Sequence, residues 1–422
     1  MHLIGKTATT LPFVLVLLSG IAWNGTGFAG DEENMSYQEA KKFLEQYTKV
    51  IELKNEHGGR IAVAPELQGR VMTSACEGAD GASFGFINVP HFKSGKIDPH
   101  FNNYGGEDRF WLSPEGGDFS LYFAPGVAQN LDHWYTPKDF NAEPFEVVSK
   151  ASDPFVEMKR PMQLKNASGT EFSLNVKRRV QMLDDARVKE IFGNDIAAVL
   201  KEQKLPFVGY ESLNTITNTG KPMSKKDGLV SIWILSMYNA APETCIIVPH
   251  KQGTEEQLGP IVKSDYFGPV PEDRLKTNVP GAVLFRADGH YRSKIGVSQK
   301  RALPVLGSID FAGGVLTVVR YNMPKEPTAC DYMNNMWGTP TEKPYQGDVV
   351  NCYNDGPSGP DGKQMGMMYE IESLSPAKEL KTGESIMHQH STLHIKADKE
   401  TLVKLAKLLF GVDYDQVRKE MF

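Results

Sequence analysis

Cysteine is scarce in this sequence, with four residues among 422. That number is too small for a disulfide-stapled scaffold, although an exported protein can still oxidise one pair. Cys330 and Cys352 flank one long loop and form the favoured pair, and four free thiols are an equally good interpretation. The four residues are Cys76, Cys245, Cys330 and Cys352.

Positive charge is not in excess. Lys and Arg number 46 against 52 Asp and Glu, the formal net charge is −6, and the basic residues form no stripe. Nucleic acid is therefore a poor candidate partner. The sequence also contains no P-loop, no dinucleotide-binding fingerprint and no nucleophile elbow, so none of these three chemistries is indicated.

Long apolar runs are almost absent. Residues 11–23 form the one marked run, interrupted by Ser19 and Gly20, and it is too short to cross a bilayer, which needs about 20 apolar residues. The run is typical of a signal peptide, and small residues suit cleavage after Ala29. We therefore expect a signal peptide over residues 1–29 and a periplasmic or secreted mature chain without stable membrane insertion. An uncleaved anchor is the alternative.

What the sequence does contain is a long series of short β-type runs. A helix comes first, because Ser36 and Glu39 form a capping box. Beyond it, helical patterns are limited to residues 184–204 and 399–410. Many strands with peripheral helices predict one large antiparallel β-sandwich domain over residues 30–422. The expected strands cover residues 51–53, 60–63, 69–73, 83–87, 109–112, 119–123, 145–148, 155–158, 172–180, 207–217, 229–238, 282–285, 291–297, 305–309, 315–321, 366–373 and 385–396.

The densest group of polar and aromatic side chains lies in residues 102–117. This stretch has three carboxylates, one arginine, three aromatic residues and two glycine pairs. Aromatic rings cover the C–H faces of a sugar, while carboxylate and guanidinium groups bind its hydroxyls in pairs. Glu107 and Glu115 are therefore candidate acids or bases, and Arg109 and Trp111 are candidate sugar-binding residues. A strand with a buried Arg–Glu pair between two tight turns is the alternative.

Two other segments extend this set of candidates. His133 and Trp134 lie in an Asp-His-Trp-Tyr sequence and are candidate binding residues, with a surface aromatic turn as an equal alternative. Residues 323–362 are rich in Pro, Asn and Gly and are too long for an ordinary connection. Long ordered loops in compact domains are often binding loops.

Three histidines recur in the predicted strand 385–396. His388, His390 and His394 share one face, because alternate strand residues point to the same side. His388 and His394 are about 20 Å apart along an extended strand, so only His388 and His390 suit one ion. With Glu372 from the preceding predicted strand, they leave a zinc or other divalent-metal site open. Otherwise His388 is an acid or base and His390 a sugar-binding residue, or the histidines bond to neighbours on a polar strand face.

Several segments resemble the galactose-mutarotase-like superfamily, which includes the aldose 1-epimerases. Residues 50–73 are similar to its opening strands, with an Asn-x-x-Gly turn and a later Gly-Arg. Residues 210–220 are similar to its strand ending in Thr-Asn-Thr-Gly, and residues 380–395 to its closing strands with a Leu-x-x-Gly-Glu turn. Residues 105–115 resemble the Gly-Gly-x-x-Arg-x-Trp-x-x-Pro-Glu stretch of uncharacterised exported relatives.

The resemblance implies a large antiparallel β-sandwich with a carbohydrate ligand in a cleft on one concave sheet. It also implies isomerase chemistry in which a histidine is the acid and a glutamate the base, but residues 229–239, where that histidine is expected, contain none. We therefore expect an exported carbohydrate-active protein with epimerase-, lyase- or hydrolase-like chemistry, or a non-catalytic glycan-binding protein. If one cleft holds both clusters, Arg109 or Trp111 lies within about 10 Å, one ligand diameter, of His388 or His390.

Overall fold

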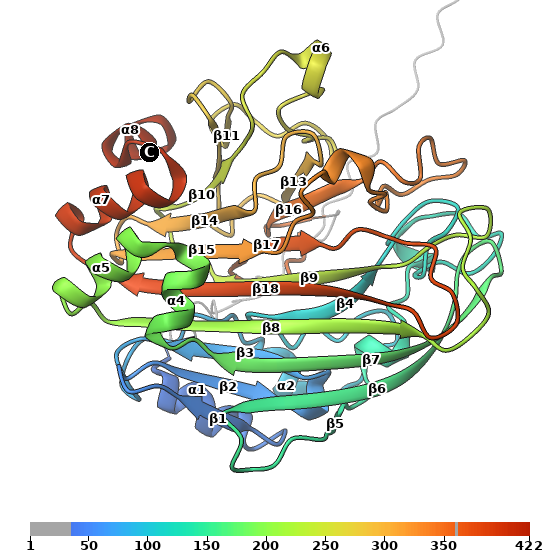
Figure 1. Cartoon of the computed structure of the whole chain (residues 1–422), viewed down its shortest axis with the longest axis horizontal. Helices are drawn as coiled ribbons and strands as arrows, with labels where there is room; N and C mark the ends of the chain where they lie inside the picture. Colours follow the sequence, from blue (N-terminus) through green and yellow to red (C-terminus); the bar gives the residue numbers. More distant parts are fainter. Residues whose placement is uncertain (1–34, 359–361) are drawn as a thin grey trace, which may run out of the picture. The chain divides into compact units, whose positions relative to one another are not determined.

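Two antiparallel β-sheets lie face to face in the computed structural model, which describes residues 35–358 and 362–422 (Figure 1). The signal peptide expected over residues 1–29 lies outside the described residues. The larger sheet has ten strands, in the spatial order β11 (Leu275–Lys276), β12 (Ala282–Arg286), β10 (Thr244–Pro249), β14 (Val305–Asp310), β15 (Val315–Tyr321), β18 (Ser385–Lys396), β8 (Phe207–Asn218), β7 (Glu171–Met182), β6 (Phe155–Lys165) and β5 (Glu146–Val147).

The second sheet has five strands and carries the candidate site described below. Its spatial order is β13 (Ser293–Ser298), β16 (Asp348–Asn354), β17 (Met368–Leu374), β9 (Ser231–Asn239) and β4 (Arg109–Ser113). A third, three-stranded sheet contains β1 (Ile51–Lys54), β2 (Arg60–Ala64) and β3 (Arg70–Ala75). The predicted fold class, a mainly β protein built on large antiparallel sheets, is confirmed.

The main hydrophobic core fills the space between the two large sheets. Val180, Ile216 and Val319 of the ten-stranded sheet belong to the same buried cluster as Ile234 and Ile371 of the five-stranded sheet. Full burial of each such side chain contributes about 1.5–3 kcal/mol. Successive strand residues point to opposite faces of a sheet. The neighbours of Ile234 and Ile371 along their strands therefore point away from the ten-stranded sheet.

Helices cover the outer face of the ten-stranded sheet at one end (Figure 1). Leu393 and Ile395 of β18 belong to a second buried cluster that also includes side chains of these helices. The covering helices are α4 (Asp185–Phe192), α5 (Asn194–Glu202), α7 (Lys399–Phe410) and α8 (Tyr414–Met421). The shorter elements are α1 (Tyr37–Leu44), α2 (Val89–Ser94), α3 (Lys138–Asn141), α6 (Glu255–Leu258), η1 (Pro65–Leu67), η2 (Leu131–His133) and η3 (Pro327–Ala329).

Local sequence explains where the helices begin and end. The capping box is confirmed, because the Ser36 side chain accepts a hydrogen bond from the Glu39 N–H and the Glu39 carboxylate accepts one from the Ser36 N–H. The helix predicted over residues 184–204 is divided into α4 and α5 at Gly193. That glycine has a φ of 102°, which other residues rarely adopt.

Some expected elements differ from the observed ones. Residues 83–87 form isolated bridges rather than a strand, and residues 119–123 contain no strand. A Cβ atom at Gly85 would lie 2.3 Å from the Met72 carbonyl oxygen. The two backbones therefore pack closely at this point, although they form no regular ladder of strand hydrogen bonds. The predicted loop 323–362 contains β16, and α8 was not expected.

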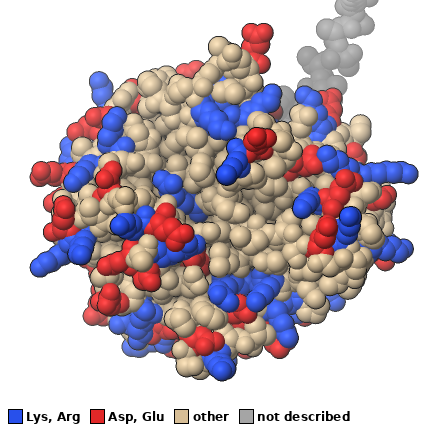
Figure 2. Space-filling view, viewed as in Figure 1, with Lys and Arg blue, Asp and Glu red and all other residues tan. Residues whose placement is uncertain are grey.

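The favoured disulfide between Cys330 and Cys352 is wrong, because all four cysteines are free thiols. Cys352 points into the core between the sheets, whereas Cys330 follows η3 in a partly exposed loop. Among the described residues, no helix has the length and apolar character to cross a bilayer. Figure 2 shows basic and acidic side chains interspersed on the face of the molecule that it displays.

Candidate functional site

A cavity of about 410 Å³ lies on the face of the five-stranded sheet that points away from the ten-stranded sheet. Alternate residues of β9 form the floor of this cavity. Trp233, Leu235 and Met237 of β9 line it, whereas Ser236 and Tyr238 of the same strand point to the ten-stranded sheet. The aromatic and charged lining residues are Phe101, Arg109, Trp111, Glu115, Trp134, Trp233, Tyr266, Phe267, Arg292, Lys294, Trp337, Tyr353 and Glu370.

Aromatic rings form much of the cavity wall. The Trp134 ring stacks on Tyr122 at 5.8 Å between centroids and faces Trp337 at 6.4 Å. Trp111 packs edge-on against Trp233 at 5.7 Å. The indole N–H groups of Trp111 and Trp134 are buried and have no hydrogen-bond partner among the described residues. The wall therefore combines apolar ring faces with buried N–H groups that make no hydrogen bond among the described residues.

Two ion pairs cross the cavity floor. The Arg109 guanidinium contacts the Glu370 carboxylate and lies 5.2 Å from the Trp111 ring centroid. Its Nε and Nη1 have no partner among the described residues. Lys294 pairs with Glu372 at 3.1 Å. The floor thus holds its carboxylates in fixed positions, and Nε and Nη1 of Arg109 are buried without a partner among the described residues.

Two glutamates of the cavity have perturbed acidity. Burial raises the pKa of Glu370 to about 7 and the neighbouring Glu372 carboxylate adds to the shift, although Arg109 opposes it. Burial also raises the pKa of Glu115, against the attraction of Lys294. A carboxyl group with a pKa near neutrality, such as that of Glu370, is suited to proton transfer at neutral pH.

The histidines of β18 lie on the other side of the five-stranded sheet, between the two large sheets. The Ser373 hydroxyl hydrogen-bonds to His388 Nε2 and to His390 Nδ1, each at 2.8 Å. His390 Nε2 also lies 3.1 Å from the Ser236 hydroxyl. Burial lowers the pKa of His388 to about 3 and that of His390 to about 4, so both are neutral at pH 7.

Glu107 belongs to the same inter-sheet layer. Its carboxylate accepts hydrogen bonds from the Ser74 hydroxyl at 2.8 Å and the Tyr210 hydroxyl at 2.9 Å, and it lies 3.2 Å from His394 Nε2. Both Glu107 and His394 are fully buried. This is a closed polar network in the core.

The structure therefore divides the predicted site residues into three groups. Arg109, Trp111, Glu115 and Trp134 all line the cavity. Glu107, His388 and His390 lie between the sheets. His133 is exposed, next to the cavity wall in sequence but not part of it.

The expectation that both clusters open onto one cleft is wrong. Arg109 and Glu370 lie on the cavity face of the sheet, whereas Ser373, which contacts His388 and His390, lies on the opposite face. Glu372 is also separated from these histidines, because it bonds to Lys294 and accepts a hydrogen bond from Trp233 Nε1 at 2.8 Å. The three therefore do not form a metal site together.

Several cavity residues were missed by the sequence interpretation, namely Glu370, Lys294, Arg292, Trp233 and Trp337. One signal was available, because Glu370 and Glu372 alternate on a strand whose other residues, apart from Ser373, are apolar or aromatic. The predicted binding loop 323–362 does contribute Trp337 to the cavity. No sequence pattern around Lys294 and Arg292 indicated that they belong to a site.

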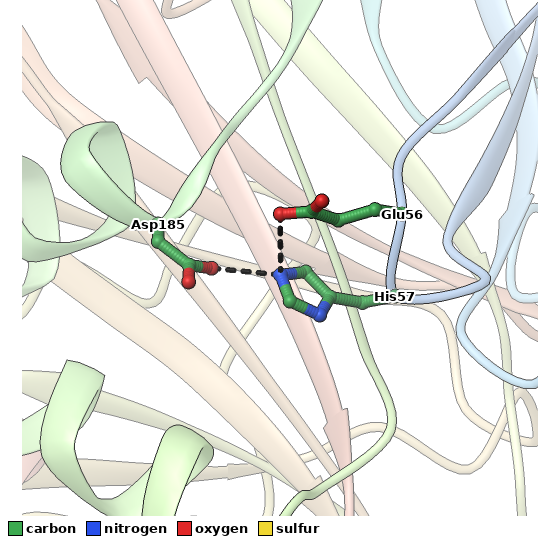
Figure 3. A group of neighbouring side chains, drawn as sticks. All are labelled: Glu56, His57 and Asp185. Atoms are coloured by element: carbon green, nitrogen blue, oxygen red, sulfur yellow. Dashed lines mark hydrogen bonds and ion pairs between the residues drawn. The ribbon is translucent and has the colours of Figure 1, made fainter.

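One group in the described residues offers three ligand atoms to a metal ion: Glu56, His57 and Asp185 (Figure 3). His57 Nε2 lies 2.8 Å from Asp185 Oδ1 and 3.8 Å from Glu56 Oε1. His57 and Asp185 also line an open groove of about 1210 Å³ beside α4 and α5. All three residues are exposed, so the arrangement is that of a solvated surface ion pair.

Comparison with known proteins gives a family. The model of a family of unknown function, DUF6786, matches residues 35–421. A search of curated proteins found no match. Among solved structures, the chain is similar to a candidate aldose 1-epimerase from Escherichia coli K12, with 11% identity, a TM-score of 0.47, and coverage of 82% of this chain and 99% of that one.

Two further structures are similar over a comparable part of the chain. A protein from Synechocystis sp. PCC 6803 has 10% identity, a TM-score of 0.45, and coverage of 83% of this chain and 96% of that one. A TPR-domain-containing protein from Parabacteroides distasonis has 11% identity, a TM-score of 0.43, and coverage of 83% and 48%.

Proposed function

We propose that this chain, which belongs to the DUF6786 family, is an enzyme that acts on a sugar or glycoside in the cavity over the five-stranded sheet. One observation carries the proposal. A single cavity contains four tryptophans and two glutamates, Glu115 and Glu370, whose pKa values are raised.

The aromatic wall supports a sugar as the ligand. Sugars present apolar C–H faces to rings and hydroxyl groups to polar side chains, and the cavity that contains the Trp134 and Trp337 rings also contains the Arg109 guanidinium. The cavity volume of about 410 Å³ also falls within the range of small-molecule sites, roughly 300–1,000 Å³. A ligand of one or a few sugar rings therefore suits both its size and its chemistry.

The two glutamates support acid–base chemistry on that ligand. At neutral pH, a group with a pKa of about 7 is present in both protonation states, so Glu370 is suited to accept a proton from a hydroxyl or a water. Glu115, whose pKa is raised by burial, is suited to donate a proton to the ring or bridging oxygen. Arg109 holds the Glu370 carboxylate in place. The same roles serve an epimerase, a lyase or a hydrolase.

A non-catalytic glycan-binding protein is the second candidate. It is favoured by the aromatic rings and basic side chains that line the cavity, because binding alone needs ring faces and donors for hydroxyls but no proton transfer. A glycan array with residues 30–422, followed by turnover assays on every sugar that binds, separates the two. Turnover supports the enzyme. Binding without turnover supports the second candidate, and absence of binding contradicts both.

We also propose that the protein is exported, because residues 11–23 have the apolar character and length of a signal-peptide core. Expression of the full chain in a Gram-negative host should yield a periplasmic or secreted product whose N-terminal residue is Gly30. A product that keeps residues 1–29 and stays in the cytoplasm would contradict export.

A further inference from the structure

Arg292 is the cation of the cavity that has no carboxylate partner. Of the other two, Arg109 pairs with Glu370 and Lys294 with Glu372. Arg292 forms no ion pair with any described residue; its Nε donates a 3.3 Å hydrogen bond to the neutral Tyr353 hydroxyl. Its two terminal nitrogens form no hydrogen bond to the described part of the chain, so this end of the guanidinium is available to a ligand.

Neighbouring rings fix the orientation of Arg292. The guanidinium carbon lies 3.9 Å from the centroid of the Phe267 ring, which is close enough for a stacked cation–π contact. The Tyr353 hydroxyl in turn donates to Asp355 Oδ1 at 2.7 Å, which fixes the phenol. Arg292, Phe267 and Tyr353 all line the cavity. The terminal nitrogens of the Arg292 guanidinium are therefore held at the cavity before any ligand binds.

We propose that the ligand is an anionic sugar, and that Arg292 binds its carboxylate or sulfate group. A guanidinium fork binds planar and tetrahedral oxyanions through two parallel hydrogen bonds, whereas a neutral hydroxyl uses only part of it. The remaining charges of the cavity agree with an anionic ligand. Glu370 pairs with Arg109 and Glu372 with Lys294, and Glu115, the other carboxylate that lines the cavity, attracts Arg292 but forms no ion pair with it, so the guanidinium has no carboxylate partner among the described residues. This inference rests on the proposed sugar site.

The test compares matched ligands. Isothermal titration calorimetry is performed with galactose, galacturonate, glucose, glucuronate and glucose 6-sulfate, and with oligosaccharides of each kind from the array. At least one anionic sugar should bind roughly tenfold tighter than its neutral counterpart, as expected for hydrogen bonds to a charged group. The carboxylate and sulfate ligands show which oxyanion is preferred.

Arg292→Met keeps the apolar stem of the side chain and removes the fork. The preference for the anionic sugar should disappear, while the neutral sugar binds as before. Arg320→Met is the matched control, because Arg320 is also half-buried and forms no ion pair with a described residue, but it lies on β15, away from the cavity. The control variant should keep the full preference.

Three results would overturn the inference. Equal binding of neutral and anionic sugars would contradict it and leave the proposed function intact, and so would a preference that survives in Arg292→Met. Inorganic sulfate that binds as tightly as the sulfated sugar would indicate an anion site without sugar recognition. If no sugar of either kind binds, the proposed function fails as well.

Discussion

The two faces of the five-stranded sheet both carry buried titratable side chains. Those on the inner face bond to one another, whereas those on the outer face line a cavity. On the inner face, Ser373 bonds to two histidines whose pKa values are lowered, and Glu107 bonds to three partners. On the outer face, Glu370 has a pKa raised to about 7, and two nitrogens of Arg109 have no partner within the described part of the chain.

This difference distinguishes a structural polar layer from a candidate site. Buried polar groups that bond to one another stabilise the fold and have little capacity left for a ligand. Buried groups that face a cavity with unused donors keep that capacity. Residue types alone do not separate the two faces, because both contain carboxylates and aromatic rings.

The largest expected effect is on turnover. Glu370→Gln should lower kcat by about 10²–10⁴-fold, because the variant loses the group that exchanges a proton with the substrate. The pH profile of kcat/KM should also lose its limb near pH 7. Glu146→Gln, a change at an exposed glutamate of β5, is the matched control and should behave as wild type. An unchanged kcat in Glu370→Gln would remove this residue from the proposed mechanism.

A substitution on the inner face should lower the stability of the fold rather than turnover. Glu107→Ala leaves the buried Ser74, Tyr210 and His394 without their common acceptor. We expect a loss of about 3–5 kcal/mol in the free energy of unfolding, measured by urea denaturation. Sugar affinity of the folded fraction should stay unchanged. A variant of normal stability with weakened sugar binding would show that the two faces are not separate in function.

The inner histidines also predict a pH dependence of stability. The pKa values of His388 and His390, about 3 and about 4 in the folded protein, are below the unfolded value of about 6.5. As the pH falls, the unfolded chain takes up these protons first. Stability from this source is therefore present above pH 6.5 and declines toward pH 3, by roughly 1.4 kcal/mol per unit of pKa difference for each histidine.

Glu370 acts in the opposite direction, because its raised pKa favours the folded state as the pH falls from 7. The measurement is therefore best made in Glu370→Gln, by urea denaturation between pH 7 and pH 4. His388→Gln in that background should flatten the curve. A curve of unchanged slope would contradict the lowered pKa of His388.

A smaller effect is expected in the aromatic wall. Trp134→Ala removes a ring that lines the cavity and should weaken sugar binding by about 1–2 kcal/mol. His133→Ala alters the adjacent residue, which is exposed outside the cavity, and should bind sugar as wild type. Titration by tryptophan fluorescence or calorimetry measures both. Equal losses in the two variants would place the binding surface elsewhere.

The smallest expected effect concerns metal. The Glu56, His57 and Asp185 group is exposed and lies outside the cavity that contains Glu370. Treatment with EDTA, followed by dialysis, should therefore leave turnover unchanged. Loss of turnover that Zn²⁺ restores, and that His57→Ala reproduces, would bring the divalent metal back into the mechanism.

The sequence by itself determined the fold class and part of the site. Short β-forming runs between Gly and Pro turns predicted a mainly β sandwich, because residue spacing within a strand is a local property. The same local chemistry identified Arg109, Trp111, Glu115 and Trp134, which all reach the cavity.

Only the tertiary structure decided on which side of a sheet each candidate lies. Strand alternation shows that His388 and His390 share a face, but not whether that face meets solvent, a ligand or another sheet. That depends on pairings between distant segments, such as β17 with β9 and β18 with β8. The pairing of β17 with β9, together with that of β4 with β9, brings Glu370 to Arg109 across 261 positions of sequence, and long-range contacts of this kind leave no local pattern to detect.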